Sequence, residues 1–574
     1  MTIKLKLLTI ACLVTLNTAP YANETPTSGE AIVSSRLPAV NAAQSPPLRD
    51  IAPAESGQTN TEPRMAPIRK SGQSTTAAQI SKAPQDPLVS VQGKIQLTPL
   101  AMPIISFDGI GGYDNKTAFG SPTSPSDANG DVGPDHYAQI VNSLYQIYDK
   151  STGQALIAPL KLSRLFAAAG ISGACATQDQ GDPIVLYDPL ANRWLLSQFN
   201  FNTNSVGDDK PPYHECIAIS QSGDPSGAYY TYDYIMTNSR FNDYPKFGVW
   251  PDGYYMTTSQ YGKNSGSFVG QAVYVFDRSK MLSGLAASMI YHDFSANSKL
   301  SILLPADLDG PAPPAGTPNY VAGFNTNDAS GLPIAKLRIF EVVADFNSTK
   351  PTIHERTESP LAVAPFNAKI CSNRYGNCVP QPGTAQKLDA LTDRPLFRLQ
   401  YRYFADNCPV DAELPGCGTL TFNHSVNSGN SKTGMRWYIA TIDPATDALH
   451  IAQQGTFGTQ DSSRWMGSVA LNKNGDLAAG YSVSGPNIYP SIRYSGRLAG
   501  DTPNVLTLGE GVLQKGSASQ TGGSERWGDY SMMAVDPADD CTFWYTNQYY
   551  NTKSDGYRWY WKTRIGSFRL ADNC

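Results

Sequence analysis

The sequence lacks the features by which membrane proteins, nucleic-acid-binding proteins and common hydrolases are recognised. Beyond residue 22 no run approaches 18 consecutive apolar residues, so no transmembrane segment is expected there. Lys and Arg number 44 against 49 Asp and Glu, the net charge is -5, and no basic block occurs. Nucleic acid is therefore not an expected partner. With six His, no Gly-x-Ser-x-Gly elbow and no His-x-x-x-His pair, the signatures of serine hydrolases and zinc proteases are missing.

Helical patterns are also scarce, and only residues 160–169 and 279–287 have the spacing of a helix. The composition of 31 Tyr, 49 Gly and 42 Pro is typical of short strands joined by many turns. From residue 104 onward, strand-length apolar and aromatic runs alternate with Gly, Asn, Asp and Pro clusters. The sequence predicts an all-β body.

The first 22 residues have the anatomy of a secretory signal peptide. Lys4 and Lys6 precede an apolar run over 7–16, which is too short for a retained membrane anchor. A lipoprotein modified at Cys12 is the alternative, although the usual Leu is missing before it. Residues 23–103 are rich in Ala, Pro, Ser and Thr and predict a disordered leader before a folded domain over 104–574. We expect a secreted protein, periplasmic or extracellular.

Eight cysteines follow the signal peptide, and an even number in an exported chain indicates disulfide bonds. No Cys-x-x-Cys pair occurs, so no zinc site is expected. Many connectivities are open, and proximity in the sequence favours four pairs, which are Cys371 with Cys378, Cys408 with Cys417, Cys175 with Cys216, and Cys541 with Cys574.

A repeated theme predicts the architecture. A polar turn with Asp or Arg, a small or apolar strand and an aromatic strand recur about every 60 residues, the period of a repeat fold with long loops. The seven copies begin at 135–137, 182–188, 243–252, 320–324, 393–399, 464–471 and 526–536. Seven copies predict a seven-bladed β-propeller, closed by residues 104–107 pairing with 565–568. Two β-sandwich domains are the alternative.

Three of these strings carry a resemblance to a known family. They are GDPIVLYD at 181–188, DYPKFGVWPD at 243–252 and RWGDYS at 526–531. They resemble a family of uncharacterised secreted bacterial proteins, presumed to be β-propellers, over about residues 104 to 574. The resemblance implies export and a propeller fold, and it implies no reaction.

Residues 127–135 contain a candidate calcium loop. Asp127, Asn129, Asp131 and Asp135 present oxygen ligands at relative positions one, three, five and nine, the spacing at the start of many calcium loops. The alternative is a turn rich in Asp, Asn and Gly that needs no metal. Calcium is the expected cofactor of this segment.

Charged residues at the starts of the predicted inner strands form the second candidate site. In a propeller they would meet at one mouth of the central channel, with Asp182, Asp243 and Asp529 as candidate acids or bases. Their ligand-binding partners would be Lys246, Arg394, Arg464, Arg526 and Trp527. Alternatively these charges cap strands and bridge blades. His424 is a further candidate base, and the aromatic residues between 544 and 561 are a candidate glycan platform.

Together these features predict a secreted, disulfide-bonded propeller that binds an extracellular ligand, a glycan or a cell-surface component. A polysaccharide-active enzyme, either a glycoside hydrolase or a lyase, is the first alternative. A surface structural protein is the second. The oligomeric state is open.

Overall fold

A computed structural model gives the structure of the compact unit Ile32–Cys574. Within the described part of the chain, no helix combines the length and the apolar character that crossing a bilayer requires. The described residues are 33–53, 64–65, 86–203, 209–236, 240–263, 266–297, 300–325, 334–347, 352–368, 370, 377–522, 525–551, 560–572 and 574.

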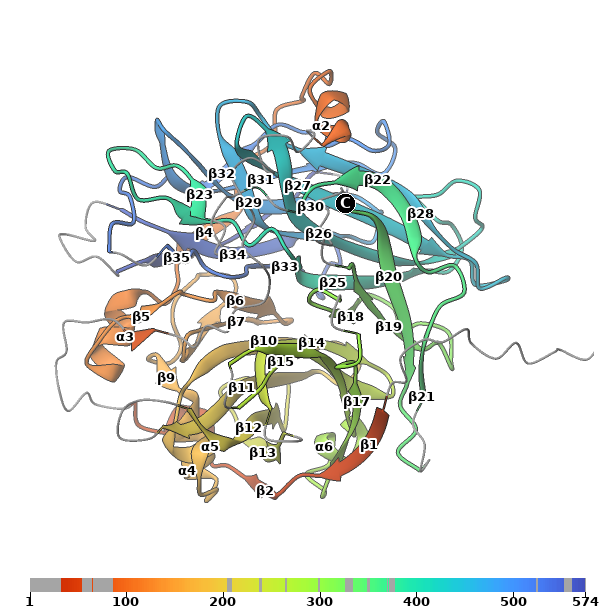
Figure 1. Ribbon diagram of the computed structural model, residues 1–574. Coiled ribbons are helices and arrows are strands. Elements are labelled where there is room, and N and C mark those ends of the chain that lie inside the picture. The colour runs from red at the N-terminus through yellow and green to blue at the C-terminus, as the bar shows by residue number, and fades with distance from the viewer. Residues whose placement is uncertain are drawn as a thin grey trace, which may run out of the picture. The chain divides into compact units, whose positions relative to one another are not determined.

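The unit is all-β, as predicted, and its larger sheets are antiparallel sets of strands that follow one another along the chain (Figure 1). The first two sets are β6 (Asn129–Val132), β7 (His136–Val141), β8 (Leu144–Asp149) and β9 (Leu160–Lys161), then β10 (Gly181–Asp188), β11 (Arg193–Thr203), β12 (Asp209–Ser220) and β13 (Tyr229–Ile235). The next two are β14 (Phe241–Trp250), β15 (Gly253–Tyr261), β16 (Phe268–Phe276) and β17 (Ser288–Asp293), then β18 (Leu304–Asp309), β19 (Asn319–Gly323), β20 (Ile334–Val343) and β21 (Thr352–Glu355), with β22 (Leu361–Phe366) also paired to β20.

The remaining sets continue this order. They are β25 (Pro395–Phe404), β26 (Cys417–Gly429), β27 (Lys432–Ile442) and β28 (Leu449–Phe457), then β29 (Ser463–Leu471), β30 (Leu477–Gly485), β31 (Ile488–Arg497) and β32 (Gly511–Gln514), and finally β33 (Met532–Val535), β34 (Phe543–Tyr549), β35 (Lys562–Phe568) and β4 (Ile105–Asp108). Short pairs join β3 (Arg64–Met65) to β5 (Thr123–Ser124) and β23 (Asn377–Val379) to β24 (Leu388–Asp389).

The first strands of these sets contact one another in a closed cycle. The order of contact is β6, β10, β14, β18, β25, β29, β33 and back to β6, and we call these seven the ring strands. Between β18 and β25 the contact is a parallel pairing, which joins two sets into one sheet. At Gly248 of β14 a Cβ atom would lie 2.3 Å from the carbonyl oxygen of Ala306 in β18, so only glycine permits this approach.

Side chains also join neighbouring ring strands where no ladder connects them. Asp131 of β6 accepts a hydrogen bond from the backbone N–H of Tyr187 at 2.7 Å, and Asp307 of β18 accepts one from Val249 at 2.9 Å. Ser468 of β29 accepts one from Met533 at 2.9 Å. These bonds satisfy backbone donors that would otherwise be buried without a partner.

Five of the seven predicted inner strands coincide with ring strands, and two do not. The first ring strand is β6, which lies in the predicted calcium loop, whereas residues 135–137 lead into the second strand, β7. The fourth is β18, and the predicted copy at 320–324 coincides with its neighbour β19. The closing pair is confirmed, because β4 pairs with β35 through Phe107 opposite Ile565.

The predicted disordered leader is wrong for two described stretches. Residues 33–44 form β1 (Val33–Pro38), which pairs with β17, and β2 (Asn41–Gln44), which pairs with β13, so one segment adds an outer strand to two neighbouring sheets (Figure 1). These strands are ordered by backbone hydrogen bonds to exposed sheet edges and need no apolar core of their own. After the short 3-10 helix at Leu48–Asp50, the helix α2 (Pro87–Gln92) is anchored by Asp86, which pairs with the buried Arg436.

Helices are short and lie in connections. They are α3 (Gly112–Phe119), α4 (Leu162–Ala168), α5 (Ala174–Thr177) and α6 (Arg278–Leu282). The prediction over 160–169 is confirmed by α4. The predicted helix over 279–287 is longer than α6. The observed helix begins after its cap, Asp277, and ends early, where the N–H of Leu285 bonds back to the carbonyl of Lys280.

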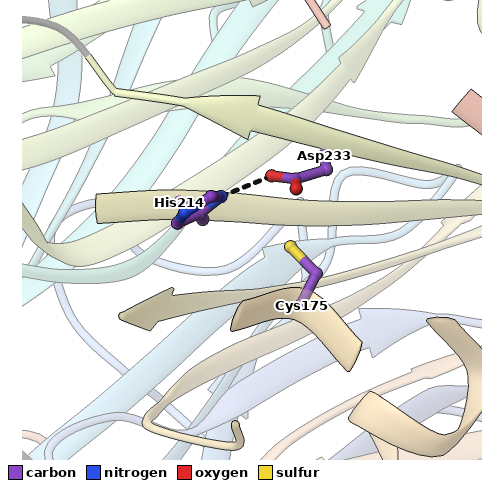
Figure 2. A group of neighbouring side chains, drawn as sticks. All are labelled: Cys175, His214 and Asp233. Atoms are coloured by element: carbon purple, nitrogen blue, oxygen red, sulfur yellow. Dashed lines mark hydrogen bonds and ion pairs between the residues drawn. The ribbon is translucent and has the colours of Figure 1, made fainter. Parts of the chain in front are cut away.

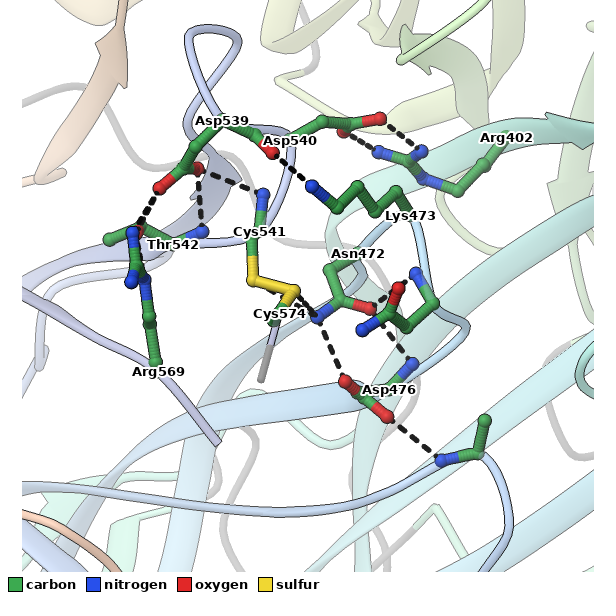
Figure 3. The surroundings of a disulfide bond; sticks show 12 residues. Arg402, Asn472, Lys473, Asp476, Asp539, Asp540, Cys541, Thr542, Arg569 and Cys574 are labelled. Atoms are coloured by element: carbon green, nitrogen blue, oxygen red, sulfur yellow. Dashed lines mark hydrogen bonds and ion pairs between the residues drawn. A yellow bond between two sulfur atoms is a disulfide. The ribbon is translucent and has the colours of Figure 1, made fainter. Parts of the chain in front are cut away.

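Three predicted disulfide bonds are confirmed. Cys175 of α5 (Figure 2) bonds to Cys216 of β12, and Cys408 bonds to Cys417. Cys541 bonds to Cys574 and holds the last residue against the closing sheet (Figure 3). Cys378 is disulfide-bonded, and its predicted partner Cys371 lies outside the described residues.

Candidate functional site

A shared backbone device positions the candidate site at the starts of the ring strands. Residues with positive φ stand before, or in a bulge of, five ring strands, and they are Asp127 (48°), Asp182 (45°), Tyr244 (56°), Met466 (49°) and Asp529 (56°). This left-handed conformation costs a non-glycine residue of order 1 kcal/mol or more, and strained residues of this kind cluster at functional sites. Three of the five are Asp, which tolerates it better than most residues.

Four carboxyl groups and two cations gather there. We call Asp127, Asp182, Asp243, Asp529, Lys246 and Arg526 the carboxyl cluster. Each is less than 9% exposed, and Asp127 and Lys246 are fully buried. Arg526 forms an ion pair with Asp529. Five of the six were predicted to converge, and the structure brings those five together.

Asp127 is the member with the fewest partners. No N–H or O–H group of the described residues donates to either of its carboxyl oxygens, and the same holds for Oδ1 of Asp182. The two carboxyl groups lie within hydrogen-bonding reach of each other, so they bond when one of them is protonated. Burial, and after it the charges of Asp529 and Asp182, raises the pKa of Asp127 well above its usual range. Burial also raises the pKa of Asp182.

Two tyrosines enclose the lysine of the cluster. The Nζ atom of Lys246 lies 3.6 Å from the ring centroid of Tyr244 and 3.8 Å from that of Tyr530, and it donates to the carbonyl of Pro245 at 2.9 Å. Burial lowers the pKa of Lys246 to about 8. The Tyr244 hydroxyl donates to the carbonyl of Asp529 at 2.9 Å and so ties β14 to the segment before β33.

The least buried edge of the cluster is polar and carries both signs of charge. Arg394 keeps 15% of its side chain exposed, pairs with Asp393 at 2.8 Å and lies 5.0 Å from the Tyr244 ring centroid. Asp243 is 7% exposed and Arg526 8%. Burial, and then the charge of Asp182, raises the pKa of Asp243 to about 8. A protonated carboxyl group and two guanidinium groups can therefore coexist here at neutral pH.

Sequence reasoning missed two further acids near the cluster. Glu215 of β12 is fully buried, accepts a hydrogen bond from Asn242 at 2.8 Å, and has its pKa raised well above the usual range by burial. Burial raises the pKa of Asp389 to about 8. The available signal for Glu215 was a carboxylate directly before an apolar run, Cys216-Ile217-Ala218-Ile219.

Three other predicted site residues lie in separate surroundings. Arg464 pairs with Glu510 at 2.7 Å, in a network shared with Arg493. Trp527 is fully buried and donates to Ser482 at 3.0 Å. His424 is fully buried against Phe366, with ring centroids 4.4 Å apart, and burial lowers its pKa to about 3. A neutral, enclosed imidazole is a core residue here, and it is not placed to act as a general base.

The predicted calcium ligands do not form one loop. Residues 129–132 are the strand β6, in which Asn129 and Asp131 accept backbone hydrogen bonds from Val185 and Tyr187, both at 2.7 Å. Asp135 is exposed, and Asp127 belongs to the carboxyl cluster. Oxygens that already bond to protein donors are poor calcium ligands, so this geometry does not support a single site over these four residues.

The predicted aromatic glycan platform is also largely buried. Tyr560 stacks on Tyr113 with centroids 4.1 Å apart, and Trp561 is fully buried and donates to the carbonyl of Thr123. Trp544 is buried as well and donates to Asp536 at 3.1 Å. Tyr557 and Trp559 lie outside the described residues.

Comparisons with known proteins give weak likenesses only. No protein-family model and no curated protein matches the chain. A protein of unknown function from Dyadobacter fermentans is 12% identical with a TM-score of 0.31, over 67% of this chain and 94% of its own. A Hadza microbial sialidase is 10% identical with a TM-score of 0.33, over 76% and 73%. An ulvan lyase bound to a GlcA(1-4)Rha3S saccharide is 10% identical with a TM-score of 0.35, over 77% and 91%. At TM-scores this low the likeness carries no argument about this chain.

Proposed function

We propose that the protein is an exported seven-bladed β-propeller that binds an extracellular glycan at the carboxyl cluster. The closed cycle of ring strands supports seven blades, with β18 and β25 as the first strands of two blades joined by parallel pairing. The disulfide bonds support folding in an oxidising compartment.

The observation that carries the binding proposal is the meeting of buried, partly unpartnered carboxyl groups with two arginines and two tyrosine rings. Carboxylates accept hydrogen bonds from sugar hydroxyls, guanidinium groups donate to sugar oxygens or acids, and aromatic rings stack on sugar faces. Perturbed pKa values concentrated in one place mark a functional site more often than a purely structural one. The least buried residues there, Arg394, Asp243 and Arg526, would make first contact with the ligand.

A glycan array with the purified protein tests this proposal. Binding is expected in the unmodified protein and lost in Arg394→Gln. The control is Arg464→Gln, which removes a more deeply buried arginine from a different network and should leave binding unchanged. Failure of the unmodified protein to bind any glycan, or equal loss in both variants, would contradict the proposal.

The raised pKa of Asp243 favours one further candidate function, a polysaccharide-active enzyme. A carboxyl group with a pKa of about 8 is protonated at neutral pH and can act as a general acid. Release of reducing ends, or of unsaturated products, from a polysaccharide panel would identify a hydrolase or a lyase. That release should be abolished in Asp243→Asn. If the protein neither binds a glycan nor releases a product from a polysaccharide, a surface structural role is favoured.

A further inference from the structure

A second polar group, away from the carboxyl cluster, lies around the first disulfide bond. Cys175 is supplied by α5, and His214 and Asp233 come from the neighbouring strands β12 and β13 (Figure 2). One ligand atom from each of these three residues lies within 4.8 Å of the other two. Among the described residues no other group of three His, Cys, Asp or Glu side chains meets this criterion.

The register of the sheet explains why these side chains meet. His214 and Cys216 are two residues apart on β12 and therefore face the same side. Asp233 lies directly opposite Cys216 on β13, and Asn200 lies opposite His214 on β11. One sheet face thus presents an imidazole, a carboxylate, a carboxamide and a sulfur, and α5 places the second sulfur over them.

The contacts within the group resemble those that prepare metal ligands. His214 Nδ1 and Asp233 Oδ1 are 2.6 Å apart, and the Asn200 amide donates to the Cys216 sulfur at 3.3 Å. The imidazole and the carboxylate, both potential ligands, therefore point at one place, and an outer-shell amide donor tunes a ligating sulfur. All four side chains of Cys175, His214, Cys216 and Asp233 are buried, with His214 the most exposed at 7%.

We propose that reduction of the Cys175–Cys216 disulfide unmasks a zinc-binding site formed by Cys175, His214 and Asp233, with Cys216 as a fourth ligand. A dithiol reductant donates two electrons and two protons to the disulfide, which becomes two thiols, while the reductant closes its own disulfide. Zn²⁺ then replaces the thiol protons, which pass to solvent. The ligand set of thiolate, imidazole and carboxylate suits zinc in tetrahedral geometry.

The third disulfide provides a closely matched control. The Asn472 amide donates to Cys574 at 3.3 Å, as Asn200 does to Cys216. The side chains drawn around it in Figure 3 are carboxylates, amides, cations and a threonine. The two disulfide sites therefore share an amide donor and differ in the imidazole, which is the ligand that the proposal requires.

Cobalt(II) titration of the Cys216→Ser protein tests the proposal, because this variant frees Cys175 without a reductant. We expect one ion per chain, with a thiolate-to-cobalt charge-transfer band and the visible bands of a four-coordinate ion, displaced by zinc. Adding His214→Gln should weaken binding by more than the roughly 10- to 100-fold that loss of an outer-shell partner costs. The Cys541→Ser control, which frees Cys574, should show no such band.

A second measurement covers the case in which Cys216→Ser does not fold. In the unmodified protein held with excess dithiol, zinc should slow alkylation of Cys175, followed by mass spectrometry, and should not slow alkylation of Cys574. The proposal is overturned if zinc leaves Cys175 unprotected, if Cys541→Ser gives the same cobalt band, or if His214→Gln leaves the affinity unchanged.

Discussion

Two buried groups of charges near the ring strands differ in how well they are satisfied. In the first, Arg398 of β25 donates to Asp307 at 2.7 Å, to Asp309 and to the carbonyl of Met533, and Arg402 pairs with Asp540. In the carboxyl cluster, by contrast, Asp127 receives no hydrogen bond from any N–H or O–H of the described residues. A fully partnered network holds strands together. A network with unpartnered acids is poised to receive a ligand or a proton.

The largest effect is expected when the satisfied network is broken. Arg398→Met leaves the buried Asp307 and the partly buried Asp309 without their cation, and removing one partner of a buried ion pair typically costs about 3–5 kcal/mol. Urea denaturation should therefore show a much lower unfolding midpoint. A fall of less than about 1 kcal/mol in the free energy of unfolding would mean that the groups around Arg398 are no better paired than those of the carboxyl cluster.

The next effect is on the pH dependence of stability, through the acids Asp127 and Asp182 of the carboxyl cluster. The folded-state pKa values of Asp127 and Asp182 are raised, and that of Asp243 is about 8, so the folded protein binds more protons than the unfolded chain above a pH of about 4. Their stabilising contribution is complete below the unfolded pKa and is lost as pH rises toward 8. Asp127→Asn, which mimics the protonated acid, should flatten this fall by up to about 1.4 kcal/mol per pH unit.

The control for this measurement is Asp135→Asn, because Asp135 is an exposed carboxylate in the same segment. The midpoint of urea unfolding, followed from pH 5 to 8, should keep its slope in this variant. An equal slope in the Asp127→Asn protein would show that Asp127 is ionised in the folded state.

A smaller effect is expected from the lysine between the two tyrosine rings. Lys246→Met removes a buried cation–π contact, and a desolvated contact of this kind is worth about 2 kcal/mol. Because the folded pKa of Lys246 is about 8 and thus below its unfolded value, the unmodified protein gains stability as pH rises above 8. The variant should lose that gain. If the midpoint of urea unfolding still rises between pH 8 and 10 in Lys246→Met, the gain in stability belongs to another titrating group.

The smallest effect should come from chelation of divalent cations. Since Asn129 and Asp131 already accept backbone hydrogen bonds, the Tm of the purified protein should not change when a chelator is added. A chelator-dependent fall in Tm that disappears in Asp127→Asn would instead place a cation in the carboxyl cluster.

Much of the fold could be predicted, because most ring strands are apolar segments that follow a polar turn. The closing pair was predictable for the same reason. The strand β6 was not, since Asn129-Gly130-Asp131 has the composition of a turn and its side chains bond to β10 instead of packing in a core. The strand β18 was hidden by Pro305, a residue that usually argues against a central strand.

The carboxyl cluster was predictable in part. Asp182 and Asp529 stand at equivalent places in the repeat and Asp243 stands one residue earlier, so their convergence follows from the ring arrangement. Arg464 stands two residues before the equivalent place, which Met466 occupies, and it pairs with Glu510, a residue of a later connection. Such pairings depend on loops whose course no repeat pattern describes. The order of residues 33–44 was equally hidden, because it depends on sheet edges far along the chain.

The long-range pairing of β1 and of β4 also constrains the order in which the protein can fold. Ser34 bonds to His292 across 258 residues, and Arg564 bonds to Ser106 across 458. During synthesis from the N-terminus, β1 therefore stays without its partner until about half of the chain has been made, and β4 stays so until nearly all of it has been made. A chain that stops short of β35 would leave β4 without its partner strand, as an unpaired sheet edge. The last sheet therefore reaches its four strands only in a chain that has been made through β35.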